Sequence, residues 1–129
     1  MEHRIQVGMT YQVAQKVTAD NTASAFGSGG IEVFATPCMI LYMEQAAMMA
    51  VEEYLAEGCT TVGTRVDIEH CAATPIGMAV TAKATLREID GRRLIYDVEA
   101  RDEKELIGRG THERFIIDKD RFMAKINSK

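Results

Sequence analysis

Apolar and polar residues alternate along most of the second half of the chain. Between residues 61 and 73, one side of the pattern carries Arg65, Asp67 and Glu69. The other side carries Val62, Val66, Ile68, His70 and Ala72. Successive side chains of a β-strand point to opposite faces, so the segment is predicted to be a strand with one face toward a core.

The same alternation recurs in two later segments and extends into a third. Residues 79–89, 93–101 and 105–117 are predicted as strands, and Asp90-Gly91 is a strong hairpin signal between the first two. Their apolar sets are Val80, Ala82, Ala84 and Leu86, and then Leu94, Tyr96, Val98 and Ala100. Further turns are predicted at residues 74–77 and 102–104, and a short terminal helix at residues 119–126. The second half therefore reads as an antiparallel meander.

The first half contains one strand, one loop and one long helix. Residues 11–18 alternate as a strand, and residues 19–30, rich in Ala, Ser, Asn and Gly, are predicted as a flexible loop. Thr36 is the expected N-cap of the helix, Pro37 suits its first turn, and Gly58 is the expected C-cap. About 20 helical residues would span roughly 30 Å. Most of the circumference is apolar, which predicts burial on several sides.

This order of elements predicts an α+β fold. A single sheet must bury one face, and the long helix is the one element that can cover it. The 129 residues suit one domain, so we expect residues 1–129 to form a single unit.

Composition and charge narrow the possible functions. The net charge of -4 argues against a nucleic-acid binder, because contacts to phosphates need a surplus of Lys and Arg. No apolar run is long enough to span a bilayer, and the N-terminus lacks the apolar core of a signal peptide. Three cysteines without paired spacing favour reduced thiols in the cytoplasm over disulfides or a cysteine-based zinc site.

Glu44 is the one ionisable residue on an otherwise apolar stripe of the predicted helix. The rest of this stripe is Pro37, Ile40, Leu41, Met48, Val51 and Leu55. We expect burial there to raise the pKa of the carboxyl and to make it a suitable general base. The alternative is a carboxylate that pairs within the core or at a dimer interface.

His70 and Thr36 are the next candidates. His70 falls on the apolar side of its strand, where an imidazole is either a satisfied core residue or a catalytic group that meets Glu44 in one pocket. Thr36 is either a simple N-cap or part of a site at the helix N-terminus, where free N–H groups stabilise negative charge.

The segment from Gly108 to Arg114 combines two glycines with charged residues. His112 and Arg114 share one side of the predicted strand with the glycines. Glycines inside a strand indicate a bulge or a close backbone approach, whereas an edge strand with solvated charges explains the pattern equally well. The spacing does not suggest metal ligands.

Several of these segments resemble one known family. They are EVFATPCMILYMEQAA, VGTRVDIEHCAATPIGMAVTAKATL, GRRLIYDVEARD and IGRGTHERFII, and together they cover nearly the whole chain. They resemble the hotdog thioesterases of the fluoroacetyl-CoA thioesterase-like group. The resemblance implies the hotdog fold, in which an antiparallel sheet wraps around one long central helix.

The resemblance also implies an activity and a site. Thr36, Glu44 and His70 match the catalytic residues of the family, Gly63 matches a glycine near the thioester carbonyl, and Arg114 matches an arginine of the active-site region. The implied reaction hydrolyses a short or medium acyl-CoA, or another pantetheine thioester, without a metal or redox cofactor. It proceeds through an acyl-enzyme or by direct attack of water. At least a homodimer is implied, because hotdog sites generally lie at a dimer interface.

Other hotdog functions remain as alternatives. The first is an enoyl-CoA hydratase or dehydratase, and the second is a non-catalytic acyl-CoA-binding module. The loop at residues 19–30 is small and polar, whereas the fluoroacetyl-CoA enzyme has a longer segment with aromatic residues there. The resemblance therefore leaves the identity of the acyl group open.

Overall fold

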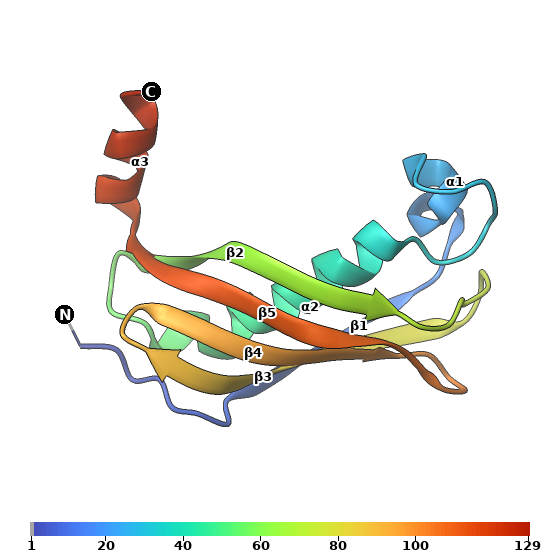
Figure 1. The fold of residues 1–129 in the computed structure, drawn as a ribbon, viewed down its shortest axis with the longest axis horizontal. Coiled ribbons are helices and arrows are strands. Elements are labelled where there is room, and N and C mark those ends of the chain that lie inside the picture. Colours follow the sequence, from blue (N-terminus) through green and yellow to red (C-terminus); the bar gives the residue numbers. More distant parts are fainter. Residues whose placement is uncertain (1) are drawn as a thin grey trace.

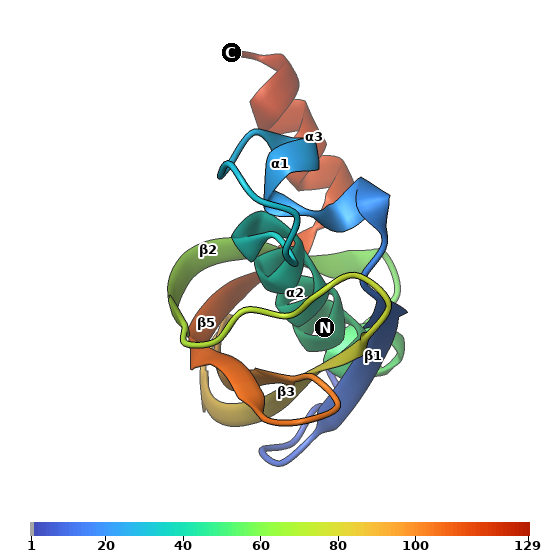
Figure 2. The same ribbon diagram turned by 90° about the vertical axis from the view of Figure 1, so that its right-hand side faces the viewer.

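Five antiparallel strands curl around one central helix in the computed structural model, which describes residues 2–129 (Figures 1 and 2). The strands are β1 (Thr10–Lys16), β2 (Cys59–His70), β3 (Ala79–Asp90), β4 (Arg93–Arg101) and β5 (Leu106–Asp118). The helices are α1 (Ala23–Phe26), α2 (Thr36–Val51) and α3 (Lys119–Asn127), with 3-10 turns η1 (Ala19–Asn21) and η2 (Glu52–Tyr54). The strand order is β1-β3-β4-β5-β2, so β1 and β2 form the two edges. The predicted α+β arrangement is confirmed.

The ends of α2 differ from the prediction. Ala35, in an extended conformation, occupies the N-cap position, and Thr36 is already helical. The helix ends at Val51 and tightens into η2, because the chain must turn back toward β2. Gly58, with φ +83°, lies in the turn just before β2 and does not cap the helix. Both predicted caps are therefore wrong.

Helix α2 lies off the centre of the sheet. It packs mainly on β3 and β1 and contacts β2 and β5 only lightly. Its buried residues are Cys38, Met39, Met43, Ala46, Ala47, Ala50 and Val51. They meet the apolar sets predicted for β3 and β4, all of which are buried. The small alanines on both sides allow the helix and the sheet to approach closely.

The opposite face of α2 is uncovered. Leu41 is 44% exposed, and the side chain of Glu44 is 40% exposed. The predicted burial of the helix on several sides, and of Glu44 within it, is therefore wrong for the single chain. Within residues 2–129, no helix has both the length and the apolar character needed to cross a membrane.

A β-bulge divides β2 into two halves. The pairing with β5 shifts between Gly63 and Arg65, which leaves Thr64 as the extra residue. Because of this extra residue, odd-numbered side chains face the helix before the bulge, and even-numbered side chains face it after the bulge. His70 stays on the inner face, whereas Val62, which was predicted to share that face, lies on the outer one.

Strand β5 lies inside the sheet, between β4 and β2. His112 is only 1% exposed and Arg114 only 6%. The alternative of an edge strand with solvated charges is therefore wrong.

Two methionines of α2 test how the helix packs. We expect Met43→Ala, which opens a cavity at a 1% exposed position, to lower the free energy of unfolding by about 2–5 kcal/mol. Met49 is 40% exposed, and Met49→Ala should cost no more than about 1 kcal/mol. Urea unfolding followed by circular dichroism measures both. Equal losses would contradict the off-centre packing.

Candidate active site

Thr36 and His70 meet where the start of α2 passes the end of β2. Thr36 Oγ1 lies 2.7 Å from His70 Nδ1, so the hydroxyl bonds the imidazole and caps no helix. Burial lowers the pKa of the His70 imidazole, because desolvation penalises its charged form. His70 Nε2 is buried and has no hydrogen-bond partner within residues 2–129. A neutral imidazole beside a hydroxyl can accept its proton or orient it.

A pocket of about 340 Å³ opens beside this pair. Its lining residues are Ala23, Ser28, Val33, Phe34, Thr36, His70, Cys71, Ala72 and Ala73. One wall comes from α1 and the turn after it, part of the loop predicted at residues 19–30. Thr22 caps α1 through Ala25 N, and Gly27 ends it in the left-handed conformation at φ +68°. The pocket is therefore walled mostly by small and apolar side chains.

Glu44 belongs to a second cluster. It lies eight residues after Thr36, which corresponds to about 12 Å along the helix axis. A Cβ added to Gly63 would lie 3.0 Å from Glu44 Oε2, so the absence of a side chain at Gly63 makes room for the carboxylate. Glu44 Oε2 is 3.8 Å from Arg114 Nη1. No hydrogen bond or ion pair joins Glu44 to His70 in the part of the chain that the structure describes.

Arg114 is fixed by three hydrogen bonds. Its Nε donates to Thr61 Oγ1 at 2.7 Å, its Nη2 to the Thr61 carbonyl at 3.0 Å, and its Nη1 lies 3.2 Å from His112 Nε2. A buried guanidinium must satisfy its donors in this way. The guanidinium is therefore held at one place, with its Nη1 3.8 Å from Glu44 Oε2.

His112 completes this cluster, and the sequence assigned it no role. Its Nδ1 lies 2.7 Å from the Arg65 carbonyl, which can only accept, so Nδ1 carries the proton. Its Nε2 then accepts from Arg114, whose nitrogens can only donate. The imidazole is therefore neutral. Burial, followed by the nearby charge of Arg114, lowers its pKa.

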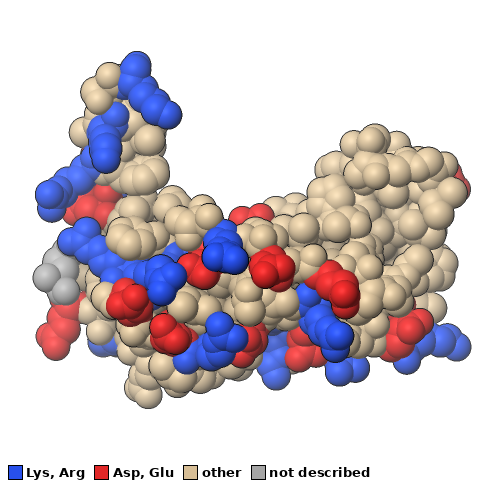
Figure 3. All heavy atoms as spheres, viewed as in Figure 1, with Lys and Arg blue, Asp and Glu red and all other residues tan. Residues whose placement is uncertain are grey.

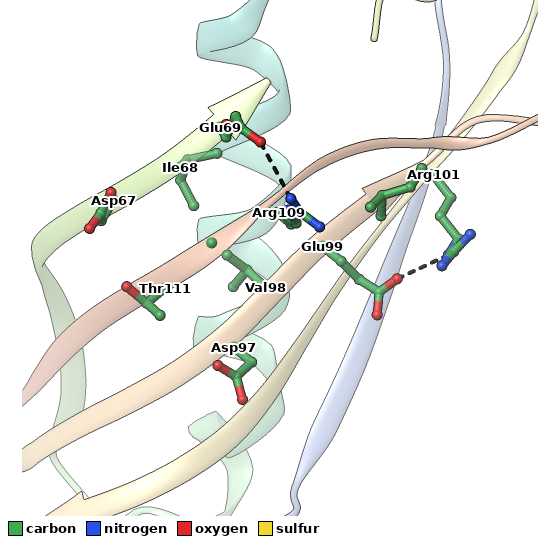
Figure 4. A pocket seen from close by; sticks show the side chains of 11 residues that line it. Asp67, Ile68, Glu69, Asp97, Val98, Glu99, Arg101, Arg109 and Thr111 are labelled. Atoms are coloured by element: carbon green, nitrogen blue, oxygen red, sulfur yellow. Dashed lines mark hydrogen bonds and ion pairs between the residues drawn. The ribbon is translucent and has the colours of Figure 1, made fainter. Parts of the chain in front are cut away.

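A hollow of about 870 Å³ lies on the outer face of the sheet over β2, β4 and β5 (Figure 4). It contains none of Thr36, Glu44 and His70. Its charges are largely paired, as in Arg109–Glu69 at 3.7 Å and Arg101–Glu99 at 3.0 Å. Lys and Arg mix with Asp and Glu across this face (Figure 3), as expected for a solvated surface.

Among residues 2–129 no cluster of His, Cys, Asp or Glu is arranged to hold a metal ion.

Comparisons with known proteins agree on one family. The family profile described as fluoroacetyl-CoA-specific thioesterase matches residues 17–120. The fluoroacetyl-CoA thioesterase of Streptantibioticus cattleyicolor is 46% identical over 98 residues, which cover 76% of this chain and 70% of that protein.

Solved structures agree with the fold. A solved structure of a fluoroacetyl-CoA thioesterase superposes with a TM-score of 0.90 at 37% identity, covering 97% of both chains. A thioesterase superfamily member from Thermus thermophilus gives a TM-score of 0.89 at 30% identity, covering 96% of this chain and 92% of that one. The predicted hotdog fold is confirmed.

The burial of His70 predicts its titration. We expect its pKa to lie below the ordinary value of about 6.5. Because the folded state then resists protonation, the neutral ring contributes its full stability above the unfolded-state pKa of about 6.5. This stability is lost as the pH falls through the folded-state pKa. An NMR titration of the imidazole protons, assigned with His70→Asn, measures the midpoint. A midpoint above 6.5 would contradict the burial.

Proposed function

This chain belongs to the fluoroacetyl-CoA-specific thioesterase family, and on this premise we propose that it hydrolyses an acyl-CoA to the free acid and the CoA thiol. The observation that supports this most directly is the 2.7 Å contact between the Thr36 hydroxyl and the His70 imidazole at the edge of a pocket. Such a pair is suited to holding and attacking a carbonyl group.

Hydrolysis requires a nucleophile for the carbonyl carbon and a proton for the leaving sulfur. Oxygen adds to the carbonyl, the C–S bond breaks, and the thiolate takes up a proton. We assign the binding or attack of the thioester to Thr36 and the movement of the proton to His70. Glu44 is the general base or the nucleophile. The Gly63 N–H contributes to stabilising the oxyanion, and Arg114 belongs to the substrate-binding region.

We propose that the protein is at least a homodimer joined along β2. This strand is an edge of the sheet, and its Val66 is exposed, as is Leu41 on the uncovered face of α2. An open edge with apolar side chains is typical of a surface that pairs with another chain. Figure 3 shows the surface hollowed between the projections formed by α1 and α3, where a second copy would fit.

The dimer also supplies a reason for the separation of the two clusters. Thr36 and Glu44 are about 12 Å apart along one helix. We propose that each active site combines Thr36 and His70 of one chain with Glu44 of the other.

The size of the pocket and the state of the cysteines support proposals for the length of the acyl chain and for the cellular compartment. A pocket of about 340 Å³ favours a short or medium acyl chain. Cys38, Cys59 and Cys71 are all free, which supports a reducing compartment such as the cytoplasm. We propose that residues 1–129 act there as one domain.

The role of Glu44 is tested by thiol release from a panel of short, medium, branched and aromatic acyl-CoAs. We expect Glu44→Gln to lower kcat by about 100-fold or more while the fold persists. Glu53→Gln, an exposed carboxylate in η2, is the matched control and should behave as wild type. Normal turnover by folded Glu44→Gln would refute the assignment. Hydration of an enoyl-CoA without thiol release would indicate a hydratase.

Mixed dimers test whether the site is shared. A purified dimer of one Thr36→Ala chain and one Glu44→Gln chain keeps one intact site if the two residues come from different chains. We expect about half of the wild-type activity, although each variant alone is inactive. A dimer of Thr36→Ala and His70→Ala chains is the control and should stay inactive, because these two residues share one chain. No recovery in the first dimer would show that each site uses a single chain.

A further inference from the structure

The buried imidazole of His112 connects the bulge of β2 to the carboxylate of Glu44. The bulge at Thr64 interrupts the ladder, and the carbonyl of the next residue, Arg65, accepts from His112 Nδ1. On its other side, His112 Nε2 accepts from Arg114, which faces Glu44. The chain of contacts runs from backbone to carboxylate through two buried side chains.

We propose that His112 is a positioning residue of the thioesterase, which fixes the guanidinium of Arg114 so that the Glu44 carboxylate stays against Gly63. This rests on the proposed function, because it assumes that Glu44 takes part in hydrolysis. His112 touches no reacting atom and acts only through Arg114.

The other bonds of Arg114 explain why the imidazole matters. Thr61 accepts from Nε and Nη2, whereas Nη1 has two neighbours, His112 at 3.2 Å and Glu44 at 3.8 Å. Without an acceptor at His112, Nη1 would have only the more distant carboxylate, and the cost of a buried unpaired donor would favour a rearrangement. Glu44 would then lose its fixed position.

Only the neutral imidazole can fill this role. A protonated ring would place an N–H against the Nη1 group of Arg114, with two positive charges in contact. The groups around His112 are Arg114 on its own strand, Tyr96 of β4 with ring centroids 6.3 Å apart, and Glu44 of α2. Glu113, the neighbour in sequence, pairs with Arg93 on the outer face. Burial raises the pKa of Tyr96, which therefore stays neutral and does not offset a second cation.

Two substitutions separate the acceptor from the bulk of the ring. His112→Gln keeps an acceptor near the position of Nε2 but cannot titrate, whereas His112→Leu fills similar space without one. We expect His112→Leu to lower kcat by about 10-fold or more with KM within about threefold, because a displaced catalytic group slows the reaction more than it weakens binding. His112→Gln should keep kcat within about threefold above pH 7. Glu113→Gln, on the opposite face, is the control.

The pH profile provides a readout that a purely structural role would not move. As the pH falls through the lowered pKa of His112, the kcat of wild type should fall more steeply than that of His112→Gln, because only wild type can protonate residue 112. Nitrogen-15 NMR of the wild-type histidines should show His112 protonated on Nδ1 alone at pH 7. This measurement does not depend on how well the variants fold.

Three results would overturn the proposal. They are a folded His112→Leu protein with kcat within twofold of wild type, equal pH profiles for wild type and His112→Gln, and a proton on Nε2 of His112. Failure of the proposed function is distinguishable, because wild type would then release no thiol from any acyl-CoA.

Discussion

The rest of the structure depends on where α2 packs against the sheet. Ala46, Ala47 and Ala50 of the helix and Ala82 and Ala84 of β3 all lie in the core where α2 packs on β3, and such small side chains let the two elements approach closely. Because the fit is best over β3 and β1, the helix covers only part of the inner face. The remaining part, over β2 and β5, is left to polar groups.

The polar side chains over β2 and β5 form a hydrogen-bonded network, which satisfies the donors and acceptors that are buried there. Arg114 satisfies its donors on Thr61 and His112, and the bulge of β2 supplies the carbonyl that fixes His112. Gly63 removes the one side chain that would push Glu44 away. The partly exposed carboxylate of Glu44 therefore lies 3.8 Å from the buried guanidinium of Arg114.

The second cluster is built differently. Thr36 and His70 bond each other beside a pocket whose wall is formed by α1, and no charged residue lines it. A neutral hydroxyl–imidazole pair and a carboxylate thus lie at different points along one helix. In the proposed enzyme, an antiparallel pair of chains unites them, and the free edge of β2 offers the place for this pairing.

The sequence by itself determined the elements and the candidate residues. Alternation with a period of two located β3, β4 and β5 closely, because local side-chain geometry alone creates that pattern. The one charged residue on an apolar helix stripe and the motif segments pointed to Glu44 and His70.

Only the tertiary structure decided where these groups lie. The bulge at Thr64 reversed the face of Val62, and off-centre packing exposed Glu44. The tertiary structure also showed Thr36 bonded to His70 and His112 bonded to the Arg65 carbonyl, because such contacts join residues from separate elements. A sequence pattern records which face a side chain takes within its own element, but the partner across the fold is fixed only when the elements pack.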